Sequence, residues 1–115
     1  MFSQNCNLEV LSLGHGNKGV QMDHNIFLGA DKLKILDLGN AETNITAGTL
    51  EPLTDLQFLF LQLNNIEKIT TNFFKNNENL EYIDASNSKI SEISVDAFTN
   101  NKRLAQMLLR YITYI

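Results

Sequence analysis

The sequence predicts a single α/β solenoid, in which one short structural unit is repeated along the chain and each copy stacks on the one before it. Three observations lead to this prediction. Leucines recur in the spacing LxxLxL at a nearly constant interval, an aliphatic pair follows the best-kept copies, and a large apolar residue precedes each copy at a fixed offset. A regular period of about 20–50 residues is typical of repeat architectures, in which each unit packs mainly against its neighbours.

Five leucines open the repeats, and their spacing is regular. They are Leu8, Leu33, Leu56, Leu80 and Leu104, so successive starts lie 25, 23, 24 and 24 residues apart. The third repeat, residues 56–69, reads LQFLFLQLNNIEKI and is the clearest. The fourth, residues 80–93, keeps its aliphatic positions, whereas the second, residues 33–46, weakens after Leu38. We therefore expect residues 1–115 to form one domain of about five repeats.

Each LxxLxL segment is expected to contain a short strand. The last two leucines of the motif are two residues apart, so both point to the same side of a strand, and the residue between them points to the other side. Parallel strands from successive repeats, about 4.8 Å apart, would then build a sheet whose inner face is aliphatic. The chain would return along the opposite side through loops or short helical turns.

A second register of large apolar residues supports the first. Six positions before the opening leucines stand Phe2, Phe27, Leu50, Phe74 and Phe98. Four phenylalanines at five equivalent positions are hard to obtain by chance. They are expected to fill the side of each coil that lies opposite the sheet and to stack along the molecule.

The pattern LxxLxLxxNxIxxI, followed by phenylalanine and repeated after about 24 residues, resembles the leucine-rich-repeat family. It resembles in particular the typical class found in many animal extracellular receptors and secreted immune proteins, and it covers nearly the whole chain. The resemblance implies a horseshoe segment with strands on its concave face. It also implies that Asn64 bonds backbone groups of neighbouring coils. Because Ala41, Ser88 and Ile112 take this position elsewhere, we expect coils two and five to be less well held than coil three.

The resemblance also places a candidate binding site on the concave face. Apolar residues gather there at positions that should face solvent: Ile35, Phe58, Phe60, Leu63 and Tyr82. Aromatic residues concentrated in one patch are typical of protein interfaces. Asp37 and Asp84 flank the patch and would suit a basic residue of a partner. Alternatively, each exposed aromatic needs no explanation of its own, or a longer parent chain covers the patch.

Composition and motifs argue against other kinds of function. The formal charge of −4 and the scattered lysines and arginines disfavour nucleic acid, which requires a basic stripe. His15 and His24 lack the companions of a catalytic triad or a metal site, and Cys6 is a lone thiol. We expect no catalytic residue, no metal and no cofactor.

The chain ends and one sequon bear on where the protein acts. Residues 1–6 do not resemble a signal peptide, and the apolar stretch 104–115 is too short to cross a bilayer. Neither end carries a recognisable cap, which favours a fragment of a longer protein over an end that self-associates. The sequon at Asn44, together with the animal-type repeat, favours a glycosylated extracellular protein or receptor ectodomain.

These observations lead to two hypotheses of different classes. The first is a non-catalytic protein-binding module in extracellular recognition or innate immunity, which uses the concave face. The second is a structural repeat segment that forms homo-oligomers through its uncapped ends. The identity of the ligand and of the parent protein stays open.

Overall fold

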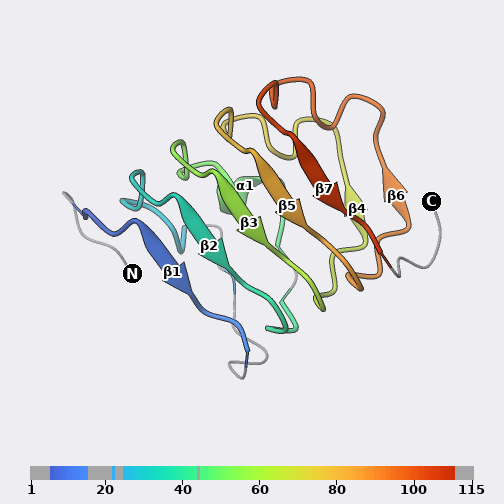
Figure 1. Cartoon of the computed structure of the whole chain (residues 1–115), viewed down its shortest axis with the longest axis horizontal. Helices are drawn as coiled ribbons and strands as arrows, with labels where there is room; N and C mark the ends of the chain where they lie inside the picture. Colours follow the sequence, from blue (N-terminus) through green and yellow to red (C-terminus); the bar gives the residue numbers. More distant parts are fainter. Residues whose placement is uncertain (1–5, 16–21, 23–24, 44, 111–115) are drawn as a thin grey trace.

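The main element of the structure, a computed structural model, is one parallel sheet of five short strands (Figure 1). The structure describes residues 6–15, 22, 25–43 and 45–110. The strands are β1 (Val10–Ser12), β2 (Ile35–Asp37), β3 (Phe58–Phe60), β5 (Tyr82–Asp84) and β7 (Gln106–Leu108), and they pair in this order. One strand comes from each predicted repeat, so we number the repeats as coils 1 to 5.

The strands pair in the register that the leucine spacing predicts. Leu36 lies beside Leu59, and Leu59 lies beside Ile83, on adjacent parallel rungs. All three side chains are fully buried, because the inner face of the sheet forms the core. Burying a leucine or isoleucine side chain contributes about 1.5–3 kcal/mol, so these repeated positions supply much of the stability. The predicted solenoid is confirmed.

Asn64 holds coil 3 to coil 2 through a buried set of hydrogen bonds. Its amide Nδ2 donates to the carbonyl oxygens of Leu38 at 2.7 Å and of Leu61 at 3.0 Å. Its Oδ1 accepts the backbone N–H groups of Ala41 at 3.3 Å and of Thr43 at 3.1 Å. The asparagine of one coil therefore satisfies buried backbone groups of the coil before it, as the resemblance implied.

The equivalent position in coil 4 makes a smaller set of bonds. The Ser88 hydroxyl is buried and donates to the carbonyl oxygen of Leu61 at 2.7 Å, with a longer contact to that of Ser86 at 3.5 Å. Because a hydroxyl has one proton and a short reach, it cannot copy the two-sided bonding of an amide. Coil 2, which has Ala41 at this position, is nevertheless bonded to coil 3, because the bonds come from Asn64. Ile112 of coil 5 lies outside the described residues.

The predicted apolar column lies opposite the sheet. Phe27, Leu50 and Phe74 are fully buried, and the rings of Phe74 and Phe98 stack with centroids 5.7 Å apart and planes 14° apart. Phe2 lies outside the described residues. The stacked rings join coils 3 and 4 on the side opposite the five-stranded sheet.

A second asparagine ladder, which the sequence analysis did not predict, runs beside this column. The buried Asn77 donates through Nδ2 to the carbonyl oxygens of Leu50 and Leu53, at 3.0 and 2.9 Å. Asn101 repeats this arrangement one coil later, with the carbonyl oxygens of Phe74 and Asn77. Both asparagines stand three residues after the apolar column position, so the spacing FxxN was the signal that could have revealed them.

The returning side differs between coil 2 and the two coils that follow. Coils 3 and 4 form a second, two-stranded parallel sheet from β4 (Lys68–Ile69) and β6 (Glu92–Ile93), where loops or helical turns were expected. Coil 2 forms the short helix α1 (Ala47–Leu50) instead. Thr46, which stands where Ile69 and Ile93 stand in the later coils, begins this helix and donates its backbone N–H to the Thr49 hydroxyl.

Candidate functional site

The outer face of the five-stranded sheet carries most of the residues that the sequence analysis singled out. In each strand the first and third residues point away from the core, so they form two columns across the sheet. The first column is Val10, Ile35, Phe58, Tyr82 and Gln106, and the second is Ser12, Asp37, Phe60, Asp84 and Leu108. Every predicted partner-binding residue except Leu63 lies in these columns on β2, β3 or β5.

Four of these side chains form what we call the aromatic patch: Ile35, Phe58, Phe60 and Tyr82. Phe58 lies between Ile35 and Tyr82 in the first column, and all four residues are half-buried. The rings of Phe60 and Tyr82 contact each other across the two strands, with centroids 5.6 Å apart and planes tilted by 47°. Because the side chains support one another, the patch presents a fixed apolar surface to solvent.

The two aspartates beside the patch have a structural role that the sequence analysis did not foresee. Oδ1 of Asp37 accepts the backbone N–H of Gly39 at 2.9 Å, and Oδ1 of Asp84 accepts that of Ser86 at 3.1 Å. This bond to the residue two positions ahead holds the chain as it turns away from the strand. Oδ2 of Asp37 also lies 3.1 Å from Nε2 of His15 on the neighbouring coil. Each carboxylate therefore stays fixed in place beside the patch.

Leu63 lies beyond the strands, at the edge of the sheet where the arrowheads of β2, β3 and β5 point (Figure 1). Its side chain is 48% exposed, which makes it more accessible than the half-buried patch residues. It lines a hollow of about 270 Å³ that spans coils 2 to 4. The other lining residues are Asn40, Glu42, Asn64, Asn65, Asn87 and Lys89.

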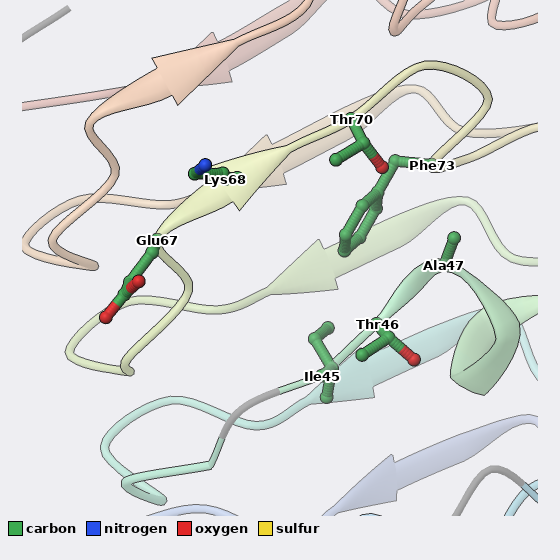
Figure 2. Close-up of a pocket in the computed structure, with 7 residues that line it drawn as sticks. All are labelled: Ile45, Thr46, Ala47, Glu67, Lys68, Thr70 and Phe73. Atoms are coloured by element: carbon green, nitrogen blue, oxygen red, sulfur yellow. The ribbon is translucent and has the colours of Figure 1, made fainter.

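A second hollow, of about 280 Å³, opens on the returning side between coils 2 and 3 (Figure 2). It is lined by Ile45, Thr46, Ala47, Glu67, Lys68, Thr70 and Phe73. It exists because α1 replaces a strand in coil 2, so no Cα atom of α1 lies within 8 Å of a Cα atom of β4. The hollow is smaller than most sites for cofactors or drug-sized ligands, and the sequence analysis did not predict it.

His24 and Asn44, the candidate glycosylation site, lie outside the described residues. Within residues 6–15, 22, 25–43 and 45–110, no group of three His, Cys, Asp or Glu side chains is placed to hold a metal ion. No helix in the described part of the chain is long and apolar enough to cross a membrane.

Comparison with known proteins addresses the repeat pattern itself. The family model described as "Leucine rich repeat" matches residues 55–111, which include the strands β3, β5 and β7. No curated protein matches the chain. The strands β1 and β2, which precede the matched segment, continue the same sheet in the same register.

Proposed function

We propose that this chain, which belongs to the leucine-rich-repeat family, binds a protein partner through the outer face of its five-stranded sheet. Leucine-rich repeats generally serve as protein-interaction modules, and stacked repeats create extended surfaces for this purpose. The outer face is the concave face of the horseshoe that the family resemblance implies.

The aromatic patch is the observation that supports this proposal most directly. Phe58, Phe60 and Tyr82 lie on two adjacent strands, and two of their rings are in contact. Large rigid aromatic side chains bury much area on binding and lose little conformational entropy, so they commonly act as binding hot spots. Nothing in the core requires aromatic residues at these outward positions, because their side chains face away from it.

The charges beside the patch indicate the chemistry of the partner. The charged residues in the two outer columns are Asp37 and Asp84, and both are acidic. The whole chain also carries a formal charge of −4. A partner that places an apolar group on the aromatic patch and a basic side chain beside an aspartate would satisfy both features.

Selection of peptides tests the proposal while the identity of the partner is open. A phage-displayed library of random linear peptides is panned against the immobilised chain, and enriched peptides are measured by interferometry. Phe58→Asp combined with Tyr82→Ala should abolish their binding while the circular dichroism spectrum stays unchanged. Val10→Asp with Gln106→Ala, a matched change in the same column outside the patch, should preserve it. Undiminished binding by the folded patch variant would reject the site.

The setting that we propose is extracellular recognition or innate immunity, which is supported by the resemblance of the repeat to the typical animal class and by the sequon at Asn44. Secretory expression followed by glycosidase treatment tests one part of it. A loss of mass that disappears in Asn44→Gln is the expected result, and an unchanged mass would count against a glycosylated chain. Light scattering at several concentrations would in turn detect self-association as an alternative function.

A further inference from the structure

Residues with a left-handed backbone conformation gather around the hollow beside Leu63. Seven described residues other than glycine have a positive φ, a region that L-amino acids rarely adopt. Five of them line this hollow, with φ angles between 51° and 60°: Asn40, Glu42, Leu63, Asn87 and Lys89. Residues in such conformations tend to cluster at binding sites, where the surrounding structure maintains them.

Among the residues at its turn position, Leu63 is the one that fits this conformation least well. The same turn position holds His15 in coil 1, Asn40 in coil 2 and Asn87 in coil 4, all with φ between 54° and 57°. Asparagine and histidine are enriched in the left-handed region, whereas leucine is not. Leu63 therefore combines an unfavourable backbone conformation with a side chain that is 48% exposed. The fold gains little from leucine at this position, which favours a role in binding.

The rest of the hollow surrounds Leu63 with hydrogen-bonding groups and one unpaired positive charge. Asn40, Asn65 and Asn87 supply side-chain amides, each of which can donate and accept hydrogen bonds as a peptide group does. Lys89 is exposed and makes no ion pair with another described residue. Glu42 lies at the opposite end, two coils away, or about 10 Å if the coils stack like strands. The hollow is therefore basic at its coil 4 end and acidic at its coil 2 end.

We propose that this hollow receives an extended segment of the protein partner, which places an aliphatic side chain on Leu63 and a carboxylate beside Lys89. The asparagine amides would bond the backbone of that segment. The inference rests on the proposed function, because it extends the binding surface from the aromatic patch around the edge of the sheet. It also assigns the orientation of the segment, since a carboxylate is attracted to Lys89 at the coil 4 end of the hollow.

Two variants test the proposal with the peptides selected on the full chain. Leu63→Asn should raise the melting temperature, by roughly 4 °C, because asparagine tolerates the positive φ better. The same variant should weaken the binding of the selected peptides about tenfold or more, because their aliphatic contact is lost. Lys89→Glu should also weaken the binding of these peptides. We expect the selected peptides to be enriched in an aliphatic residue close to an acidic one. Val95→Asn, which removes a fully exposed apolar side chain at an ordinary φ, is the control and should change neither property.

The outcomes separate this inference from the proposed function. If the Phe58 and Tyr82 variant abolishes peptide binding but Leu63→Asn and Lys89→Glu do not, the hollow is not part of the surface and the patch remains the site. If the patch variant still binds, the proposed function fails, and the inference fails with it. A melting temperature that is unchanged or lower in Leu63→Asn would contradict the argument from strain even if binding is lost.

Discussion

Strand β3 shows two kinds of residue side by side. Leu59 points inward and is fully buried, whereas Phe58 and Phe60 on either side point outward and are half-buried. The column of Leu59 is aliphatic in every strand: Leu11, Leu36, Leu59, Ile83 and Met107. The column of Phe58 changes from valine to glutamine along the same sheet. Each inner residue packs against an equivalent residue of the next coil, whereas the outer residues face solvent or a partner. The fold therefore restricts the choice of residue only in the inner column.

The largest effect that would test this contrast is the loss of an inner leucine. Leu59→Ala should destabilise the chain by about 3 kcal/mol, because it removes buried methyl groups and leaves a cavity between two rungs. Phe58→Ala, the adjacent outward residue, should cost less, since its site can refill with water. Urea denaturation of both variants measures the difference. Equal losses would show that the outer column also forms part of the core.

Removal of the buried amide of coil 3 should have the next largest effect. Asn64→Ala removes the hydrogen bonds that this side chain makes with the backbone N–H groups of Ala41 and Thr43 and with the carbonyl of Leu38, at a cost of about 2 kcal/mol or more. Ser88→Ala, the matched change in coil 4, should cost about 1 kcal/mol because fewer bonds are lost. Equal midpoints in urea for the two variants would contradict the view that Asn64 is the stronger link.

The glycines in the turns after β1 and β2 allow a comparison between neighbouring coils. A Cβ atom at Gly14 would overlap the backbone carbonyl of Gly39, which cannot move without shifting β2. A Cβ at Gly39 would instead meet the end of the Gln62 side chain, which can rotate away. We expect Gly14→Ala to cost about 2 kcal/mol and Gly39→Ala to cost less. Thermal melts of both variants measure these losses of stability. A lower melting temperature for Gly39→Ala than for Gly14→Ala would contradict the prediction.

The smallest effect concerns an exposed pair at the start of β1 and β2. Lys34 donates a 2.7 Å hydrogen bond to Glu9, which lowers the pKa of the Glu9 carboxyl and raises that of Lys34. Because the pKa of Glu9 is lower in the folded state, its stabilisation is present above the ordinary value of 4.5 and is lost as the pH falls through the folded pKa. The contribution of Lys34 is present below 10.5 and is lost as the pH rises through its raised pKa.

Glu9→Gln should therefore produce a small loss of melting temperature near neutral pH that disappears in acid and in high salt. A loss that persists at pH 3 in high salt would show that Glu9 contributes through packing instead. On the same coil as Glu9, the side-chain oxygen of Asn7 accepts a 3.0 Å hydrogen bond from Lys32. Asn7→Asp would place a carboxylate beside this lysine, so the melting temperature should change in the direction opposite to that of Glu9→Gln.

The spacing of the leucines predicted the sheet to the residue, but it did not predict how the returning side would fold. Leu36, Leu59 and Ile83 could be aligned because each coil repeats the same inward contacts. Thr46 gave no comparable signal. Where the later coils have a strand that ends at Ile69 or Ile93, coil 2 has Thr46 followed by α1, and the hollow shown in Figure 2 lies beside it.

The candidate site was predicted as a set of residues but not as a geometry. The outward columns followed from strand alternation, which is a local property of the backbone. The contact between Phe60 and Tyr82 depends on how adjacent strands twist, and the bonds from Asp37 and Asp84 to the turn depend on the path of the chain after the strand. The left-handed conformation of Leu63 was not predicted either, because leucine itself does not favour it; the only signal was that the aligned positions hold His15, Asn40 and Asn87.

The sequence by itself determined the solenoid, the register of its strands and the identity of the buried positions, because a fixed period forces equivalent residues into equivalent neighbourhoods. Tertiary structure alone decided where the returning side opens and how the outer side chains of neighbouring coils contact one another. These features depend on distances between coils. Such distances arise only after the chain has stacked, so no pattern within a single repeat encodes them.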